Sequence, residues 1–148
     1  MQDTKYIQYY LYKHIPLSKA MEVKAVEASK NRVVLKAPLP PNINHRDTVF
    51  GGSASALAIL SAWTLVHFRL QHEGLNCRVV IQKNTMSYDK PILSEFVATC
   101  ILDDNVKWQR FVKILSSKKR SRIVLNSYLE CKGEKVGYFE GALVAIII

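Results

Sequence analysis

The sequence has few residues that could support metal or disulfide chemistry. Its 148 residues include only three cysteines (Cys77, Cys100 and Cys131), and these are not spaced like the ligands of a zinc site. The N-terminal residues lack the apolar core of a secretion signal, and an odd cysteine count then favours reduced thiols. We therefore expect a cytoplasmic protein without a bound metal.

Acidic residues are also scarce. Twelve aspartates and glutamates stand against 21 lysines and arginines, which gives a formal net charge of +9 at pH 7. This balance favours polyanionic partners, namely nucleic acid, acidic carrier proteins or phosphate-bearing cofactors, although the same charge can serve solubility alone. Hydrophobic residues make up 49% of the chain and charged residues 22%, which is typical of a globular protein. We expect one domain over residues 1–148.

Charge is absent altogether from residues 48–68. An apolar run of this length must be considered as a membrane span. However, glycines, hydroxyl residues and His67 dilute it, and the amphipathic strands elsewhere in the chain need a helix to cover them. We therefore predict a helix over residues 51–74 that is buried on every side, and we expect no membrane.

The rest of the chain alternates between helical and strand patterns. A helix is predicted at 4–14, where apolar residues recur at helical spacing before Pro16. Trp108, Phe111, Val112 and Leu115 repeat the helical spacing and predict a helical insertion at 105–116, with a continuous strand as the alternative. Strands are predicted at 21–28, 32–37, 78–88, 95–102, 122–131 and 135–148.

These elements predict an α+β fold in which a strongly curved antiparallel sheet wraps around one long central helix. The C-terminal segment 142–148 is apolar on both faces. A lone sheet would leave one of those faces or an edge exposed to water. We therefore expect at least a homodimer.

Candidate chemistry concentrates where the segment PNINHRDTVFGG, residues 41–52, leads into the long helix. Gly51 and Gly52 stand at the predicted helix start, where free backbone N–H groups attract developing negative charge. The first turns of the helix carry no carboxylate to serve as base or nucleophile. Ser53 is not followed by the glycine of a nucleophile elbow, and no strand precedes it.

This helix entrance, Asn44-His45 followed by Thr48-Val49-Phe50-Gly51-Gly52, resembles that of the hot-dog fold acyl thioesterases. The chain is most similar to the family of the YiiD C-terminal thioesterase-like domain. Further matching residues, spread over nearly the whole chain, are Ile15-Pro16-Leu17, Tyr88, Pro91 and Trp108-Gln109-Arg110-Phe111. The resemblance implies a hot-dog fold with a helical insertion between strands four and five. Relatives often follow an acetyltransferase domain, so we expect this chain to act alone or with a separate partner.

The resemblance also implies roles for residues at the entrance. In related thioesterases the first glycine of the pair donates its N–H to the thioester carbonyl, which assigns that role to Gly51. An asparagine seven residues earlier helps to hold the attacking water, which corresponds to Asn44. Relatives commonly place a carboxylate about two turns into the helix, where this chain has Ile59.

Three other residues could replace the missing carboxylate as a base. His45 and Asp47 are the nearest titratable residues in the loop, and Asp89 could come from a second copy. The alternatives are loop hydrogen bonding for His45, a turn or helix-cap role for Asp47 and a solvated turn for Asp89.

A basic run follows the predicted insertion and is a candidate for binding the phosphates of coenzyme A or the acidic surface of acyl carrier protein. Its residues are Lys118, Lys119, Arg120 and Arg122. A solvated basic turn is the alternative. Nucleic-acid binding would require aromatic residues among these cations, whereas Trp108 and Phe111 fall on the apolar stripe.

The first functional hypothesis is an acyl-thioester hydrolase acting on acyl-coenzyme A or acyl carrier protein. It requires no cofactor, because coenzyme A or phosphopantetheine is part of the substrate. The second hypothesis is a non-catalytic acyl-thioester binding module that works with a separate acyltransferase or fatty-acid synthesis enzyme. We expect neither nucleic acid nor a membrane as a partner.

Overall fold

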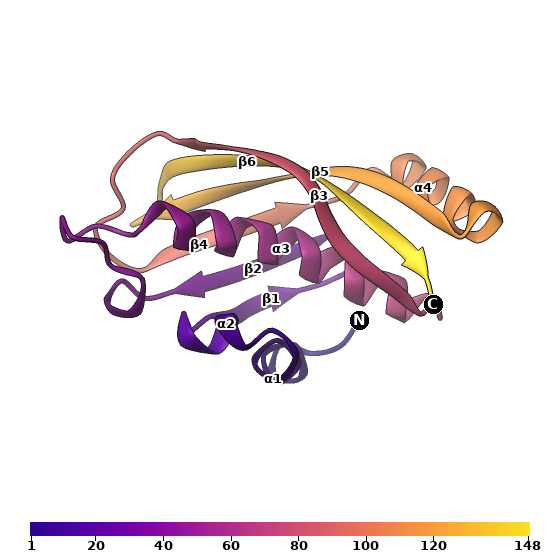
Figure 1. The fold of residues 1–148 in the computed structure, drawn as a ribbon, viewed down its shortest axis with the longest axis horizontal. Coiled ribbons are helices and arrows are strands. Elements are labelled where there is room, and N and C mark those ends of the chain that lie inside the picture. Colours follow the sequence, from indigo (N-terminus) through magenta and orange to yellow (C-terminus); the bar gives the residue numbers. More distant parts are fainter.

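The computed structural model describes residues 1–148 and shows a six-stranded antiparallel sheet curved around the long helix α3 (Figure 1). The helices are α1 (Thr4–His14), α2 (Pro16–Ala20), the short 3-10 helix η1 (Pro40–Asn42), α3 (Gly51–His72) and α4 (Asn105–Lys118). The strands are β1 (Lys24–Ala28), β2 (Arg32–Ala37), β3 (Cys77–Tyr88), β4 (Phe96–Ile101), β5 (Arg120–Cys131) and β6 (Glu134–Ile147). The predicted α+β architecture is confirmed, with small differences at the ends of elements.

The two edges of the sheet differ in how they are protected. The strand order is β1-β2-β4-β5-β6-β3, so β1 and β3 are the edge strands. β1 has five residues, and the side chain of Gln8 on α1 accepts the backbone N–H of Ala25 at 3.2 Å. β3 has 12 residues, and no strand of the chain pairs with its outer side. Long unprotected edges favour pairing with another chain.

The charge-free segment forms the core helix α3. Leu57, Ala58 and Leu65 are fully buried along it. The Ser61 hydroxyl donates to the Ala58 carbonyl at 2.7 Å and lies 2.8 Å from the Ser127 hydroxyl, so its polar group is satisfied inside the core. By length and composition alone α3 could cross a membrane, but 67% of its apolar window is buried inside the fold. The helix therefore covers the concave face of the sheet. The predicted burial on every side is wrong for the single chain, because a stripe of α3 that includes Ile59, Trp63 and His67 is only half-buried.

The predicted insertion is the helix α4, and the alternative of a continuous strand is wrong. Asp104 caps its start by accepting the N–H of Lys107 at 3.0 Å. Trp108, Phe111 and Leu115 are buried, as the stripe predicts. Figure 1 shows α4 at one end of the molecule, far from the start of α3.

Two short helices were not predicted. Pro16 ends α1 and also occupies the first turn of α2, where its fixed φ and missing N–H are tolerated. The same reasoning explains η1, which begins at Pro40 within the predicted loop. Periodicity cannot reveal elements of three to five residues, because they contain too few turns.

Candidate active site

The loop before α3 is fixed by hydrogen bonds to distant parts of the chain. Asn42 is buried, and its side-chain amide donates to the carbonyls of Met21 (3.0 Å) and Pro38 (2.8 Å). The Asn42 carbonyl accepts the N–H of Phe50 at 2.7 Å. The residue that precedes the glycine pair is therefore held in one position.

The first turn of α3 presents two backbone N–H groups without an acceptor. Phe50 is the N-cap residue and offers no side-chain cap, while its carbonyl accepts the N–H groups of Ser53 (2.9 Å) and Ala54 (3.1 Å). The N–H groups of Gly51 and Gly52 have no hydrogen-bond partner within the chain. Unpaired donors at the positive end of a 22-residue helix form a site suited to an oxyanion.

Two aromatic rings flank these donors. A Cβ atom on Gly51 would lie 3.5 Å from Cε1 of Tyr88 and 3.9 Å from its hydroxyl oxygen. A Cβ atom on Gly52 would lie 2.3 Å from the ring of Phe50, so a larger residue there would have to displace that ring. Tyr88 was not predicted to lie at the site. It adds an apolar wall and one hydroxyl group beside the free N–H groups.

Asn44 organises the loop through its side chain. Its Oδ1 accepts the N–H groups of Arg46 (2.8 Å) and Thr48 (3.1 Å), and its Nδ2 donates to the Thr48 hydroxyl at 2.8 Å. An amide nitrogen carries two protons. One Nδ2 proton therefore remains for a ligand.

His45 and Asp47 lie on the exposed tip of the same loop. Asp47 has φ = 63°, in the left-handed region that aspartate tolerates better than most residues, and its N–H donates to the Asn44 carbonyl at 3.3 Å. It is a turn residue, and the alternative role as a helix cap is wrong because Phe50 occupies the cap position. Asn44, His45 and Asp47 thus belong to the loop that leads into Gly51.

No carboxylate lies on α3 near this entrance. Ile59 is half-buried and packs against the hydrophobic core. Asp89 directly follows Tyr88, and its carboxylate accepts the Ser87 hydroxyl at 2.8 Å. Because Tyr88 contacts Gly51, the chain's own Asp89 lies at this end of the molecule, whereas the sequence suggested a carboxylate from a second copy.

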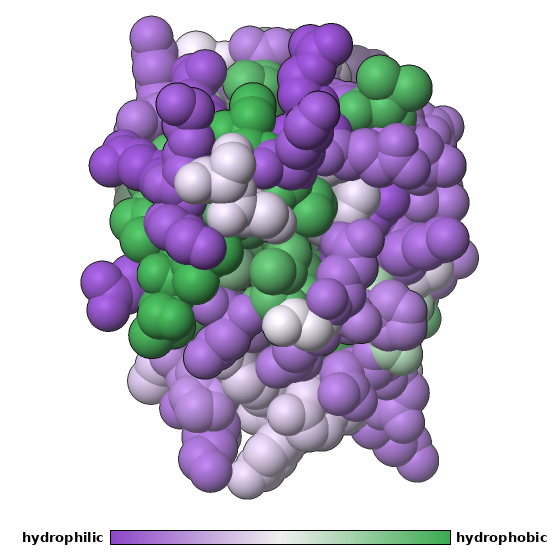
Figure 2. Space-filling view, turned by 90° about the vertical axis from the view of Figure 1, so that its right-hand side faces the viewer, coloured by the Kyte–Doolittle hydropathy of each residue, from purple (hydrophilic) through white to green (hydrophobic).

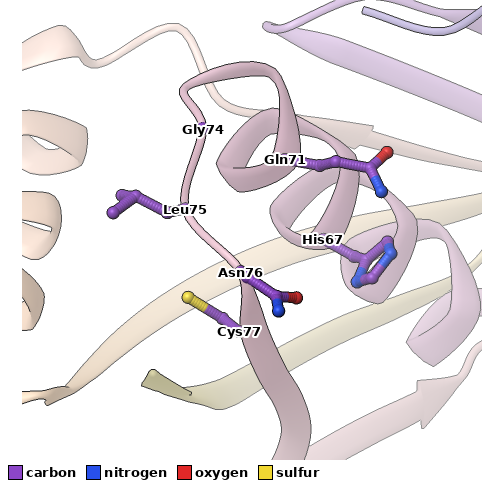
Figure 3. A pocket seen from close by; sticks show the side chains of 6 residues that line it. All are labelled: His67, Gln71, Gly74, Leu75, Asn76 and Cys77. Atoms are coloured by element: carbon purple, nitrogen blue, oxygen red, sulfur yellow. The ribbon is translucent and has the colours of Figure 1, made fainter. Parts of the chain in front are cut away.

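The main cavities of the single chain do not include Gly51. One cavity of about 290 Å³ lies at the other end of α3 and is lined by His67, Gln71, Gly74, Leu75, Asn76 and Cys77 (Figure 3). Figure 3 shows the Cys77 sulfur directed away from the His67 ring. Burial raises the pKa of the Cys77 thiol, which disfavours the reactive thiolate. This cavity therefore contains no thiol–imidazole pair.

His67 is packed in an aromatic cluster beside that cavity. Its ring stacks on Trp63 with centroids 4.5 Å apart and lies 5.1 Å from the ring of Tyr10. Burial, and then the nearby His14, lower the pKa of His67 from its ordinary value of 6.5. The folded chain therefore keeps His67 neutral at a pH at which the unfolded chain would protonate it.

We expect this difference to make the free energy of unfolding depend on pH. The contribution of His67 is fully present above about pH 6.5 and is lost as the pH falls through its lowered folded-state pKa. Urea unfolding at about pH 7.5 and about pH 5.5 should show a smaller loss of stability for His67→Gln than for the wild type. His72→Gln, an exposed site on the same helix, is the control and should keep the wild-type loss. An unchanged loss in His67→Gln would contradict the prediction.

The four predicted phosphate-binding cations, Lys118, Lys119, Arg120 and Arg122, run from the end of α4 into β5, away from Gly51. None of them forms an ion pair. Arg122 is registered with Val144 of β6, whereas Tyr88 is registered with Gly137. The seven residues between these positions on β6 span roughly 23 Å at about 3.3 Å per residue. A single chain therefore does not bring these cations to Gly51.

Comparisons with known proteins agree with this architecture. Residues 4–147 match the model of the family described as "Putative thioesterase (yiiD_Cterm)". A protein of unknown function from Chlorobaculum tepidum TLS is similar in structure, with 25% identity, coverage of 98% of this chain and 94% of that chain, and a TM-score of 0.91. A "putative thioesterase" from Shewanella oneidensis has 22% identity, coverage of 97% of this chain and 96% of that chain, and a TM-score of 0.82.

A third similar structure is a protein of unknown function from Pseudomonas aeruginosa, described as a "probable thioesterase". It has 16% identity, coverage of 99% of this chain and 97% of that chain, and a TM-score of 0.86. The structures confirm the predicted hot-dog fold. The family match supports a thioesterase-like function.

Proposed function

The chain belongs to the family described as "Putative thioesterase (yiiD_Cterm)", and on that premise we propose that it hydrolyses acyl thioesters at the entrance of α3. The observation that supports this most directly is the pair of N–H groups on Gly51 and Gly52, which have no hydrogen-bond partner. A thioester carbonyl oxygen at these donors would be polarised. The oxyanion formed on attack would be stabilised further, because donors fixed in a helix need no reorganisation.

In the proposed reaction, a water oxygen attacks the carbonyl carbon of the thioester. His45 takes a proton from that water, while the remaining Nδ2 proton of Asn44 orients it. The tetrahedral oxyanion then collapses, the C–S bond breaks, and the leaving sulfur receives the proton that His45 took from the water. The products are a carboxylic acid and a free thiol, and no step requires a metal.

The proposed substrate is an acyl group on coenzyme A or on the phosphopantetheine of acyl carrier protein. Both carriers present a phosphate at the far end of a pantetheine arm, and the net charge of +9 favours such anionic molecules. The three buried free cysteines fit a protein that works in the reducing cytoplasm.

We also propose that a second copy completes the site by antiparallel pairing along β3. The free edge of β3 is long, whereas β1 is short and covered by α1. Antiparallel pairing would set the Cys77 end of one β3 beside the Tyr88 end of the other. Lys118 and Arg120 of the second copy would then lie at the end of the sheet that carries the first copy's Gly51.

The spacing of the strands is compatible with a substrate shared between two copies. In such a dimer, three strand spacings separate β3 of one copy from β5 of the other, roughly 14 Å at about 4.8 Å each. A pantetheine arm has about 13 bonds between sulfur and phosphate, the length of roughly four extended residues, or about 15 Å. A thioester at Gly51 could thus place its phosphate near the second copy's cations.

Release of free thiol from a panel of acyl-coenzyme A and acyl carrier protein substrates tests the proposal. We expect turnover in the wild type and a loss of roughly tenfold or more in Asn44→Ala, because that change removes both the loop hydrogen bonds and the water-holding proton. Asn44→Asp can still accept the N–H groups of Arg46 and Thr48 but has no amide proton, so it separates the structural role from the water-holding role. If the amide proton holds water, Asn44→Asp also loses activity; full activity in Asn44→Asp would assign Asn44 to loop structure alone.

The second candidate function is non-catalytic binding of acyl thioesters in partnership with a separate acyltransferase or fatty-acid synthesis enzyme. The absence of a carboxylate on α3, where Ile59 stands, favours it, because polarising a thioester does not by itself activate water. Tight binding of an acyl thioester without thiol release would support this function and contradict the first.

A further inference from the structure

A groove lies between α4 and the start of β5, at the end of the molecule opposite Gly51. Two adjoining cavities of about 470 and 520 Å³ form it, and they share Ile114 and Arg122. Other charged residues that line it include Lys107 and Arg110 from α4 and Arg120 from β5. We refer to this surface as the α4–β5 groove.

The charged residues of this region are almost all positive. Residues 105–122 contain seven lysines and arginines and no aspartate or glutamate. None of these cations forms an ion pair, although the chain forms three such pairs elsewhere. The one carboxylate that lines the groove, Asp104, lies at its end and caps α4. Unpaired cations concentrated on a concave surface attract an anionic partner.

The groove also exposes apolar surface between its cations. Val106 is 70% exposed and Ile114 is 39% exposed, and both line it together with Val144 or Val124 of the sheet. Figure 2 looks at the end of the molecule that carries α4 and the C-terminus, and it shows hydrophobic patches bordered by hydrophilic side chains. A partner that fits must therefore combine acidic and apolar groups.

α4 is held rigidly enough to serve as a docking element. The guanidinium of Arg69 on α3 donates to the Leu102 carbonyl (3.3 Å), just before α4, and to the side chain of Asn105 (3.3 Å), the first residue of α4. The same guanidinium lies 4.3 Å from the centre of the Trp108 ring. The groove is therefore a preformed surface, which limits the entropy lost on binding.

We propose that the α4–β5 groove docks an acidic amphipathic helix of a partner protein. This inference rests on the proposed function, in which that protein is the carrier of the acyl thioester. A helix matches the groove because the 14 residues of α4 extend over about 21 Å at about 1.5 Å per residue. This length allows a partner helix to lie alongside α4 over several turns. A flat anionic membrane would reach only the rim of a concave surface.

Single-stranded nucleic acid fits the groove less well. Binding of that kind relies on aromatic side chains that stack with bases. Trp108 and Phe111 are each 2% exposed and belong to the core. The docked carrier would sit on one copy and present its pantetheine arm to Gly51 of the other, as the proposed β3 pairing requires.

A matched pair of charge reversals on α4 tests the proposal. Arg110 lines the groove, whereas Lys113, three residues along the same helix, lines neither cavity; both side chains are exposed. We expect Arg110→Glu to weaken binding of purified acyl carrier protein at least tenfold, measured by isothermal titration calorimetry. Lys113→Glu, with the same change in net charge, should weaken binding less than threefold. Equal losses of affinity in the two variants would mean that the carrier is attracted by the overall positive charge of the protein, and would overturn the groove as the docking site.

A third variant tests the apolar part of the groove. Ile114→Ser leaves the charge unchanged and should still weaken binding several-fold. Unchanged binding would mean that the partner is held by electrostatic attraction alone, and would contradict docking of an amphipathic helix.

Binding of vesicles of phosphatidylglycerol and phosphatidylcholine, or of a single-stranded oligonucleotide, with no binding of the carrier would also overturn the proposal. Hydrolysis of acyl-coenzyme A with no binding of the carrier would refute only the docking, whereas binding with no thiol release from either substrate would refute only the hydrolase.

Discussion

Replacement of Gly51 by proline is expected to lower kcat for thioester hydrolysis about 100- to 1,000-fold, the usual cost of losing one oxyanion donor. Proline removes the backbone N–H and adds no polar group. Gly51 is the first residue of α3, where proline is tolerated, and Phe50 before it already has the extended ψ of 132° that proline requires. The substitution therefore removes the proposed donor and leaves the helix able to form.

Gly51→Ala is the matched control because it keeps the N–H group. Its Cβ atom would lie 3.5 Å from Tyr88, an ordinary van der Waals distance, so we expect activity within a few-fold of the wild type. Stopped assays of thiol release measure both variants, and thermal unfolding checks that both remain folded. Equal losses in the two variants would attribute the effect to bulk beside Tyr88. Full activity in Gly51→Pro would remove Gly51 from the mechanism.

The architecture could be predicted because its long elements have simple patterns. The absence of charge over residues 48–68 predicts a core helix, and α3 is buried against the sheet over most of its surface. Trp108, Phe111 and Leu115 define the stripe of α4 because each packs into the core. These patterns depend on local sequence and on burial, and both can be inferred without coordinates.

The position of Tyr88 could not be predicted, because it depends on an irregularity in β3. Counting in steps of two from Val79 would direct Ser87 towards α3 and Tyr88 away from it. The register shifts between Ile81 and Lys83, and this bulge reverses the faces of the residues that follow. Tyr88 therefore turns towards Gly51, although the sequence contains no clear mark of the bulge.

The cations illustrate a second limit of sequence analysis. The composition of residues 118–122 indicates affinity for anions, but not the distance to the glycine pair. That distance depends on the register of β5 with β6, which places Arg122 beside Val144 and far from Gly137. A role for these cations at Gly51 therefore depends on a second copy, and this can be tested directly.

Mixing two impaired variants is expected to restore activity if each site uses two copies. Gly51→Pro lacks the oxyanion donor. We expect Lys118→Glu/Arg120→Glu to bind the substrate phosphate poorly, which should lower kcat/KM at least tenfold. A mixed dimer would contain one site with neither defect and one site with both. Random pairing makes half of the dimers mixed, so the mixture should recover about a quarter of wild-type activity. The two variants are unfolded and refolded together, and thiol release is measured afterwards.

Mixing Gly51→Pro with Asn44→Ala is the control. Both defects lie on the loop and helix entrance of one copy, so every site of the mixed dimer keeps one of them and no recovery is expected. If cations and donors instead belonged to the same copy, the first mixture would also fail to recover and would show only the average of its parents. Recovery in the first mixture but not in the second can arise only when the phosphate-binding cations and the N–H groups at Gly51 come from different chains, because no other arrangement produces a site free of both defects.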